Sequence, residues 1–327
     1  MAEPPLGSYL VLGASGLASY HALKKLANKP GIFVTAIHHS RPIGVLAPNI
    51  KTLQADLRKP YSLDEVMVNT DYLLHFAGIV ATAPLLDLDP ISPLNDTLAI
   101  TVNVLASAQR ARVEKMVWLS STTGYPELDR ELIEDDMFTG DPPPAWYAIG
   151  WLNRYLETLC RAYVEHLGYK SNCHSMCITV LRPSLMYGEN DNFSLEVGHF
   201  LPALIRRVVE RHNPIEIWGD GKQTRDLIYA GDVVNAAFLA LGRQTGFDCF
   251  NISNGTSVTV NQVAQLIIEI DSFSDARIEH RLDRPGSRTE IRISNEKAQE
   301  KLKFLPSISL MEGCQATVQW YRRKGTI

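Results

Sequence analysis

The sequence has few cysteines, no long hydrophobic run and no marked excess of charge of either sign. Its 327 residues include five cysteines, an odd number with no Cys-x-x-Cys pair, which argues against both a disulfide framework and a zinc site. No apolar run approaches the roughly 20 residues needed to span a bilayer. A formal net charge of -4 offers no basic footprint for nucleic acid or for a membrane surface. We therefore expect a cytoplasmic protein that binds neither.

Two short stretches bear on these exclusions. Residues 1–9, MAEPPLGSY, place an acid and two prolines before the first apolar run, unlike a secretory signal peptide. Cys173 and Cys177 flank His174 closely enough to suggest metal ligands, but thiols buried separately in the core are the better interpretation. The sequence therefore predicts no metal site.

What the sequence does contain is a regular alternation of short β-rich runs and helical segments. Helices are expected from about Leu17 to Leu26 and from about Leu98 to Arg112. Strands separated in this way are joined by right-handed crossovers and form a parallel sheet with both faces covered. We therefore predict an α/β fold with a doubly wound parallel sheet, the Rossmann fold. The five expected strands lie within residues 8–16, 31–39, 50–57, 71–78 and 115–121.

The pattern changes after about residue 182. Loops rich in Pro, Gly and Asn interleave there with helices expected at about 199–212 and 260–270. We expect residues 1–182 to form the dinucleotide-binding domain, with later segments returning to it. Residues 183–327 are expected to form mainly a smaller substrate-binding lobe that closes over the carboxyl edge of the sheet.

A glycine turn, VLGASGLAS, joins the first strand to the first helix. Gly13 permits the tight turn, and Gly16 lets a pyrophosphate approach the helix N-terminus. Ser15 and Leu17 complete the turn, and Ser19 stands where a third glycine is often found. Glycine-rich turns also occur for structural reasons, but the strand–turn–helix context predicts dinucleotide binding.

The end of the second strand indicates which dinucleotide is bound. An enzyme that reads the ribose 2′-hydroxyl of NAD usually carries an Asp or Glu at this place. This chain has His38, His39, Ser40 and Arg41 instead, which are neutral or positive donors suited to a 2′-phosphate. The sequence therefore favours NADP(H) over NAD, although NAD remains an option. The alternative is a basic loop that contacts only solvent.

Further motifs follow the glycine turn in a fixed order. Together they resemble the extended short-chain dehydrogenase/reductase family, in its NAD-dependent epimerase/dehydratase branch that acts on sugar nucleotides, and the resemblance covers nearly the whole chain. The motifs are Asp56-Leu57, HFAG at 75–78, Asn103 within TVNVLASAQ, LSSTTGYP at 119–126, LRPSLMYG at 181–188, WGDGKQTRDLIYAGDV at 218–233 and RPGSRTEIRIS at 284–294. The resemblance implies further cofactor contacts from Asp56, Leu57, Phe76, Ala77, Gly78 and Asn103.

Within that branch, the stretches YGENDNF and GHFLPALIRR are most similar to GDP-fucose synthases and related reductase-epimerases. This similarity implies catalytic roles for Ser121 and His199, and it places Thr123 where that group has a cysteine. Thr122 and Thr123 follow Ser121 where the 4,6-dehydratases carry an Asp-Glu pair. Dehydration needs such a carboxylate to protonate the departing hydroxyl, so it is disfavoured. Thr123 and Asn192 are then expected to contact the substrate.

Two arginines match family positions that clamp a nucleotide diphosphate. Arg225 and Arg288 lie in the two last motifs, and a forked guanidinium suits two phosphate oxygens. Each arginine could instead form a surface ion pair. By the same reasoning, Ser121 could merely close a loop and His199 could merely begin a helix.

The family's proton-transfer pair is the point at which this sequence departs. In the family, a tyrosine moves the substrate proton, and a lysine four residues later lowers the tyrosine pKa and binds the nicotinamide ribose. If Tyr147 is the tyrosine, Trp151 replaces the lysine; in a second register, Ile149 replaces the tyrosine and Asn153 the lysine. Asn153 could then still contact the ribose. The second register agrees better with the helix's apolar stripe: Leu152, Leu156, Leu159, Tyr163 and Leu167.

Three functions remain open. The first is an enzyme acting on a sugar nucleotide or similar activated small molecule, by hydride transfer or epimerisation with NADP(H), in which Ser121 works with Tyr147 or His199. The second is a family member that binds NADP(H) without redox turnover, as a regulatory or structural subunit. The third is a non-redox lyase or isomerase that keeps the dinucleotide in its pocket. The resemblance also implies a homodimer that pairs helix to helix.

Overall fold

The computed structural model describes residues 2–79, 82–166, 176–283 and 292–324, and its main body is a parallel sheet. Seven strands pair in the order β10-β6-β5-β4-β1-β2-β3, and every neighbouring pair is parallel. Because β1 lies between β2 and β4, the chain reverses its direction across the sheet beside β1, where open α/β sheets bind ligands. The strands are β1 Gly7–Leu12, β2 Ile32–His38, β3 Ile50–Gln54, β4 Tyr72–His75, β5 Lys115–Leu119, β6 Cys177–Pro183 and β10 Phe247–Ile252.

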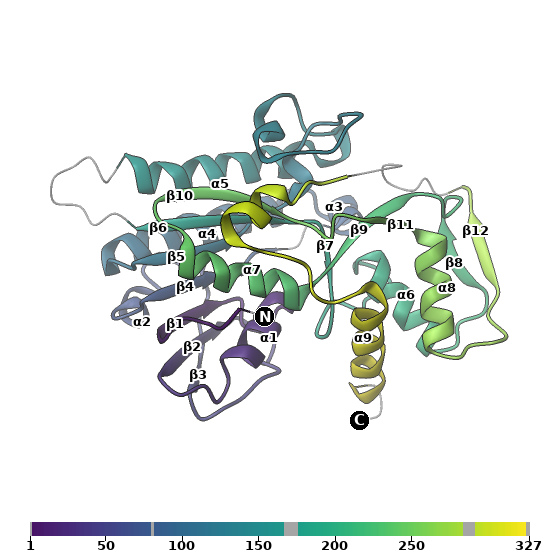
Figure 1. Ribbon diagram of the computed structural model, residues 1–327, viewed down its shortest axis with the longest axis horizontal. Helices are drawn as coiled ribbons and strands as arrows, with labels where there is room; N and C mark the ends of the chain where they lie inside the picture. Colours follow the sequence, from purple (N-terminus) through teal and green to yellow (C-terminus); the bar gives the residue numbers. More distant parts are fainter. Residues whose placement is uncertain (1, 80–81, 167–175, 284–291, 325–327) are drawn as a thin grey trace.

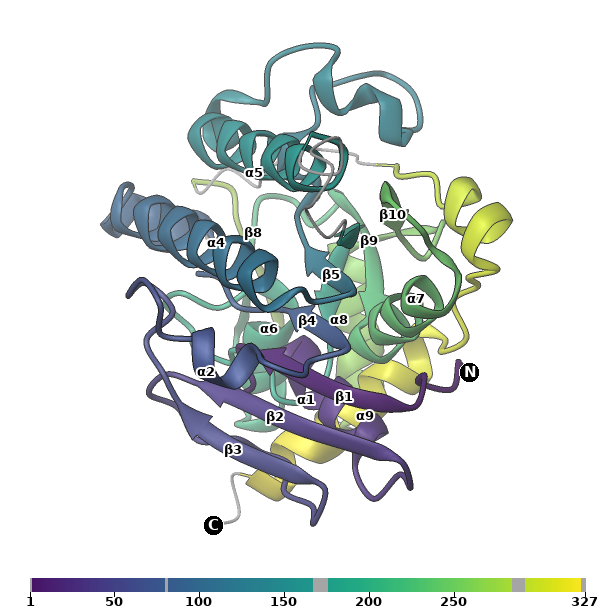
Figure 2. The ribbon, with the colours of Figure 1, turned by 90° about the vertical axis from the view of Figure 1, so that its left-hand side faces the viewer.

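Helices cover both faces of this sheet, as Figure 2 shows. Side chains alternate along β1, so that Tyr9 and Val11 join one core cluster while Leu10 and Leu12 join another. The first cluster packs under α1 and α7, and the second packs under α4 and α5. The predicted doubly wound α/β fold is therefore confirmed. The covering helices are α1 Leu17–Leu26, α2 Asp64–Met67, α4 Ser92–Ala111, α5 Tyr147–Glu165 and α7 Ala230–Arg243, and a short helix α3 Ala83–Leu88 follows β4.

Helix α4 begins earlier than the sequence pattern indicates. It was expected from about Leu98 but starts at Ser92, where Pro93 occupies one of the first helical positions and favours helix initiation. It ends where Arg112 turns to a left-handed φ of 57° and its N–H bonds back to the carbonyl of Ala108. The apolar stripe alone marks only the part of this helix that packs on the sheet.

The second lobe lies at one end of the molecule (Figure 1) and has its own core. A three-stranded sheet has the order β11-β9-β7, and β12 pairs with β8 in a separate two-stranded sheet. The strands are β7 Leu185–Tyr187, β8 Ile215–Trp218, β9 Thr224–Tyr229, β11 Ser257–Thr259 and β12 Ile278–Arg281, and the helices are α6 Phe200–Val209, α8 Val260–Ile270 and α9 Leu310–Lys324. Since α7 and β10 belong to the main body, the chain passes between the two parts more than once.

Short helical turns connect these elements. Three 3-10 turns, Thr122–Gly124, Glu134–Phe138 and Pro144–Trp146, lie between β5 and α5, and a π turn spans Ala298–Leu302. None of the helices in the described ranges is long and apolar enough to cross a membrane.

The metal hypothesis finds no support in the part of the chain that the structure describes. No group of three or more His, Cys, Asp or Glu side chains gathers there in a way that could hold a metal ion. Cys173 and His174 lie outside the described residues, and Cys177 is a free thiol that accepts a hydrogen bond from the Gly246 amide.

Candidate active site

The glycine turn between β1 and α1 brings backbone, not side chains, to the edge of the sheet. Gly13 has a φ of +74°, and a Cβ there would lie 2.8 Å from the Phe76 carbonyl oxygen, so the position requires glycine. Gly16 is the N-cap of α1, which begins at Leu17, and no side chain of the described residues caps it. The amide N–H groups of the first turn are thus available to an anion. This arrangement fits a dinucleotide pyrophosphate.

Two polar side chains hold this turn in place. Ser19, at the position of the usual third glycine, is fully buried and donates to the Leu12 carbonyl at 3.5 Å, which keeps α1 close to β1. Asn190, from the segment after β7, donates to the carbonyl oxygens of Ser15 at 3.0 Å and Gly16 at 3.4 Å. Sequence reasoning missed Asn190, since only the fold brings it 175 positions back along the chain to Ser15.

The residues predicted to read the 2′-phosphate lie at the end of β2. The Nδ1 atom of His38 is buried and has no hydrogen-bond partner among the described residues. His39, Ser40 and Arg41 are exposed beside it. A buried polar atom without a partner calls for a ligand or water, so this corner fits the ribose or phosphate of a dinucleotide.

The loop after β3 is fixed by its own charges and by α4. Arg58 donates to Asp56 through Nε (2.9 Å) and Nη2 (3.0 Å), and this interaction lowers the pKa of Asp56 to about 2. Asn103 donates from Nδ2 to the carbonyl oxygens of Leu57 at 3.0 Å and Arg58 at 2.8 Å. Asn103 therefore holds the loop that carries Asp56 and Leu57, two of the expected cofactor contacts.

The loop after β4 lies beside the glycine turn. The Phe76 amide donates to the Leu12 carbonyl at 3.2 Å, which extends the pairing of β4 with β1. Ala77 packs against the core, and a Cβ on Gly78 would meet no atom of the described residues within 4 Å. Gly78 therefore borders open space at the carboxyl edge of the sheet, as a cofactor-binding loop requires.

A hydrogen-bonded chain begins directly after β5. The Ser121 Oγ accepts from the Thr123 amide at 3.2 Å and lies 3.1 Å from the Thr123 Oγ1. Thr123 Oγ1 in turn accepts from Asn153 Nδ2 at 3.1 Å. Ser121 thus closes the turn Thr122–Gly124, yet it is only half-buried, so its hydroxyl can also meet a ligand. We call these three residues the Ser121 chain.

Helix α5 buries the residues of one register and exposes those of the other. Ile149 and Asn153 are 7% and 5% exposed, whereas Tyr147 and Trp151 are 52% and 41% exposed. Tyr147 and Trp151 also contact each other edge to face, with ring centroids 6.5 Å apart. Tyr147 and Trp151 therefore lie on the exposed side of α5, whereas Ile149 and Asn153 are buried.

His199 lies at the start of α6, as its N-cap residue. Burial lowers the pKa of His199, so the ring is neutral at pH 7 and can accept a proton. The loop before it is tied to the loop after β4, because Thr82 donates from Oγ1 to the Val197 carbonyl at 3.0 Å. This contact places the His199 segment over the carboxyl edge of the main sheet.

The predicted substrate contacts are spread more widely. Arg225 lies on β9, and burial lowers its pKa. Asn192 is exposed, and its Oδ1 accepts from the Ser194 amide at 3.1 Å within its own loop. Arg288 lies outside the described residues. No contact among the described residues joins Arg225 and Asn192 directly to the Ser121 chain.

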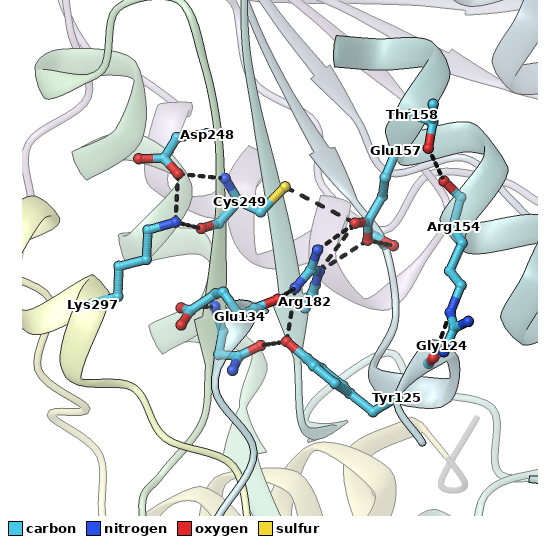
Figure 3. Close-up of polar contacts among 12 residues, drawn as sticks. Gly124, Tyr125, Glu134, Arg154, Glu157, Thr158, Arg182, Asp248, Cys249 and Lys297 are labelled. Carbon is cyan, nitrogen blue, oxygen red and sulfur yellow. Dashed lines mark hydrogen bonds and ion pairs between the residues drawn. The ribbon is translucent and has the colours of Figure 1, made fainter. Parts of the chain in front are cut away.

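Beneath the Ser121 chain lies a buried charged network that the sequence did not reveal. Arg182 on β6 and Glu157 on α5 form an ion pair at 2.5 Å, with side chains 3% and 2% exposed. Burial opposes the charge of Arg182, but Glu157 and Tyr125 more than offset it and raise the arginine pKa. Arg182 also donates to the Tyr125 hydroxyl at 2.8 Å (Figure 3), and Ser120 donates to Glu157 at 2.6 Å.

Asp191, next to Asn190, is a second unanticipated carboxylate. Burial raises its pKa to about 7, opposed by the hydrogen bond from the Asn192 amide at 2.7 Å and by the charge of Arg41. Its Oδ2 atom is buried without a hydrogen-bond partner among the described residues. A carboxyl group with a raised pKa thus lies next to Asn190, which bonds to the glycine turn.

Comparison with known proteins identifies the family and agrees with the fold. Residues 9–253 match the model of the NAD dependent epimerase/dehydratase family. The chain is 28% identical to GDP-L-fucose synthase 1 of Arabidopsis thaliana over 277 residues, 83% of this chain and 81% of that one. A UDP-N-acetylglucosamine 4-epimerase from Methanobrevibacter ruminantium superposes with a TM-score of 0.84 at 19% identity, covering 98% of this chain and 99% of that one. A UDP-glucuronic acid 4-epimerase from Bacillus cereus, in complex with UDP-glucuronic acid and NAD, has a TM-score of 0.80 at 21% identity, covering 97% and 99%.

Proposed function

Because the chain belongs to the NAD-dependent epimerase/dehydratase family of enzymes, we propose that it is an NADP(H)-dependent reductase or epimerase of a sugar nucleotide or similar activated small molecule. The named relatives are synthases and epimerases of sugar nucleotides. The observation that carries the proposal is the half-exposed Ser121 hydroxyl at the carboxyl end of β5. Only β4 separates β5 from β1 and its glycine turn in the sheet.

A reduction needs one hydride transfer and one proton transfer, and an epimerisation through a ketone needs both to be removed and then returned on the other face. The nicotinamide, when bound, supplies or takes up the hydride at a substrate carbon that bears oxygen. Ser121 hydrogen-bonds that oxygen as its charge changes. His199 is the proton-transfer group in this proposal, since a tyrosine without a neighbouring cation has a pKa near 10 and is a poor base at pH 7.

Turnover of a panel of sugar nucleotides with NADPH and NADH tests the proposal. We expect wild type to turn over at least one substrate, and His199→Asn to lose roughly 100-fold or more in kcat, the contribution typical of a positioned acid or base. Thr139→Val, a change on the surface loop before α5, is the control for a mutation outside the site. Binding of NADPH without turnover of any substrate would overturn the enzymatic proposal.

Cofactor preference is a separate test. We propose that Arg41 and Ser40 favour the 2′-phosphate of NADP(H), supported by their exposure beside the unpartnered His38 nitrogen. A charge-assisted hydrogen bond is worth about 1.5–3 kcal/mol, so Arg41→Ala should weaken NADPH binding roughly ten- to a hundredfold in calorimetry. NADH binding should hardly change. Equal affinities of wild type for both cofactors would contradict this assignment.

Nucleotide-diphosphate binding is proposed for Arg225 together with Arg288. A nucleoside diphosphate at about 100 times its Kd should stabilise the protein by roughly 2.7 kcal/mol. Arg225→Ala and Arg288→Ala should each remove most of the thermal shift. Absence of a shift with GDP, UDP, CDP, ADP and dTDP would point to a substrate that is not a nucleotide.

One observation favours a second candidate function. In the second register Asn153 takes the lysine position of the family, and its neutral amide, which donates to Thr123, supplies no cation. A member that binds NADP(H) without redox turnover, as a regulatory subunit or as a non-redox lyase or isomerase, would need no such cation. Restoring the pair with Ile149→Tyr and Asn153→Lys separates the two, because a new redox activity appearing only in the variant supports the second candidate.

We also propose a homodimer in the cytoplasm. Tyr147, Trp151 and Tyr155 lie four residues apart along α5 and are 52%, 41% and 55% exposed, so they form an aromatic stripe that a second copy could cover. Sedimentation of wild type and Trp151→Glu measures this, with a dimer expected only in wild type. A monomeric wild type would contradict it.

A further inference from the structure

We propose that Asn153 and Thr123 are positioning residues that hold Ser121 as a hydrogen-bond donor toward the substrate oxygen, a role that rests on the proposed function of the same site. Asn153 then replaces the missing lysine by a different physical principle. A lysine would act through its charge, whereas the amide acts through the direction of its hydrogen bonds.

The direction of the hydrogen bonds follows from the donor capacity of each group. The Asn153 Nδ2 can only donate, so the Thr123 Oγ1 at 3.1 Å accepts from it. The single proton of Thr123 is then available to the Ser121 Oγ, also at 3.1 Å. The Thr123 amide donates to the same oxygen at 3.2 Å. With its oxygen accepting twice, Ser121 directs its own proton out of the chain.

Helix α5 is shaped to hold this arrangement. At Gly150 a Cβ would lie 2.8 Å from the Thr123 carbonyl oxygen, so the glycine lets the helix touch the turn. Arg154, 2% exposed, donates from Nε to the Gly124 carbonyl at 2.9 Å and from Nη2 to the Gly140 carbonyl at 2.5 Å. Gly150, Asn153 and Arg154 thus all contact the turn that carries Thr123.

In this arrangement Ser121 stabilises charge on the substrate, and a different group transfers the proton. A serine that donates stabilises negative charge as it develops on the substrate oxygen, and a neutral chain gives it no means of taking up a proton. The proton must then be moved by another group. Ser121 and its two supports should therefore affect the height of the barrier without setting the pH dependence of kcat.

A thiol probe tests the arrangement without any substrate. In the full chain saturated with NADPH, Ser121→Cys is alkylated with iodoacetamide over a range of pH, and its peptide is quantified by mass spectrometry. We expect the second change Thr123→Val to raise the thiol pKa by about one unit or more, since it removes a hydrogen bond to the thiolate. Thr123→Ser should restore the lower value, because it keeps the hydroxyl.

Asn153 is tested in the same background. Asn153→Asp can no longer donate, so the carboxylate draws the Thr123 proton away from position 121 and the thiol pKa should rise by at least as much. Thr158→Val is the matched control, because Thr158 lies exposed on the same helix and donates only to the Arg154 carbonyl; it should shift nothing. An unchanged thiol pKa in both Thr123→Val and Asn153→Asp would overturn the proposal.

Turnover supplies the second readout. With a substrate found in the panel, Thr123→Val should lower kcat about tenfold, with KM and the pH profile of kcat unchanged, and Thr123→Ser should recover most of the rate. A displaced pH profile in Thr123→Val would overturn the donor role. Should wild type turn over nothing, the proposed function fails, while the thiol titration still decides how Ser121 is held.

Discussion

Two adjacent serines at the carboxyl end of β5 face opposite environments. Ser120 turns inward and donates to Glu157, which is paired with Arg182 in a fully buried network. Ser121 turns toward the open edge and is held by Thr123 and Asn153, with no charge in the chain. Both networks are anchored on α5, one helical turn apart, at positions 157 and 153.

The two networks differ in how completely they are closed. Arg182 donates to the Glu157 carboxylate, the Tyr125 hydroxyl and the Glu134 carbonyl at 2.5–3.2 Å. The Tyr125 hydroxyl in turn donates to the Asn251 Oδ1 at 2.7 Å. The Ser121 chain ends instead on a half-exposed hydroxyl. A buried charge is tolerated only when it is fully partnered. We therefore expect the network around Arg182 and Glu157, the inner network, to support the fold. The Ser121 chain, the outer chain, is free to contact the substrate.

The largest expected effect comes from breaking the inner network. Glu157→Leu leaves Arg182 charged and unpaired in the core, and it should cost about 3–5 kcal/mol of unfolding free energy. Glu165→Gln, which removes an exposed i,i+4 pair with Arg161, should cost at most about 0.5 kcal/mol. Urea denaturation measures both.

The double variant Glu157→Leu with Arg182→Leu completes this experiment. It removes both charges together, so it should recover part of the loss of the single change. A single Glu157→Leu variant as stable as wild type would show that the inner network does not support the fold.

Removing the Ser121 hydroxyl should affect turnover strongly and stability only weakly. Ser121→Ala deletes the donor to the substrate oxygen, and we expect kcat to fall about 10²–10³-fold. The unfolding free energy should change by no more than about 1 kcal/mol, since Ser121 is half-buried and neutral. If the same variant unfolds readily while turnover of the folded fraction is normal, the division between the two networks is wrong.

The buried carboxylate of Asp191 should make the stability of the protein depend on pH between about pH 4 and 8. The folded-state pKa of Asp191 is raised by burial to about 7, above the unfolded value near 3.9, so the folded state binds more protons between pH 4 and 7. Stability from this group is therefore greatest below pH 4 and falls as pH rises to 7. Asp191→Asn should stabilise the protein by at most about 4 kcal/mol at pH 8 and by almost nothing at pH 4.

Thermal unfolding at the two pH values measures this difference. Asp220→Asn, an exposed carboxylate in the loop before β9, serves as the control and should give the same small change at both. Equal effects of Asp191→Asn at pH 4 and pH 8 would show that the buried carboxylate is not the source of the pH dependence.

The smallest effect is expected at the residue that first looks catalytic. Tyr147 is half-exposed and turned toward Trp151, outside the Ser121 chain. Tyr147→Phe should therefore change kcat by less than about twofold, far less than His199→Asn. If Tyr147→Phe is inactive while His199→Asn has normal activity, Tyr147 is the proton-transfer residue and the role proposed for the Ser121 chain is wrong.

Much of the cofactor end was predictable because its evidence is local. The turn of Gly13 and Gly16 joins a strand to a helix within one short stretch, and the structure places both where the sequence indicated. The alternation of strands and helices likewise predicted the doubly wound sheet. The start of α4 was misjudged, since residues before Leu98 do not continue its apolar stripe although Pro93 helps to begin the helix.

The catalytic end was predictable only as a set of candidates. The sequence showed that no lysine lies four residues after Tyr147 or Ile149, but it left both registers open. Packing of α5 on the sheet buries Ile149 and Asn153 and exposes Tyr147, and our proposal takes the second register for this reason. The apolar stripe of a sequence defines the rotation of a helix about its axis only approximately. The contact of α5 with the turn at Thr123 fixes that rotation.

The sequence by itself therefore determined the fold class, the glycine turn and the absence of a lysine four residues after Tyr147 or Ile149, all of which are properties of neighbours along the chain. Tertiary structure alone decided that Asn153 reaches Thr123, that Arg182 meets Glu157 across 25 positions, and that Asn190 returns to the glycine turn across 175. The physical reason is that hydrogen bonds and buried ion pairs act over about 3 Å in space, and only the packing of helices on the sheet brings such distant residues within that range.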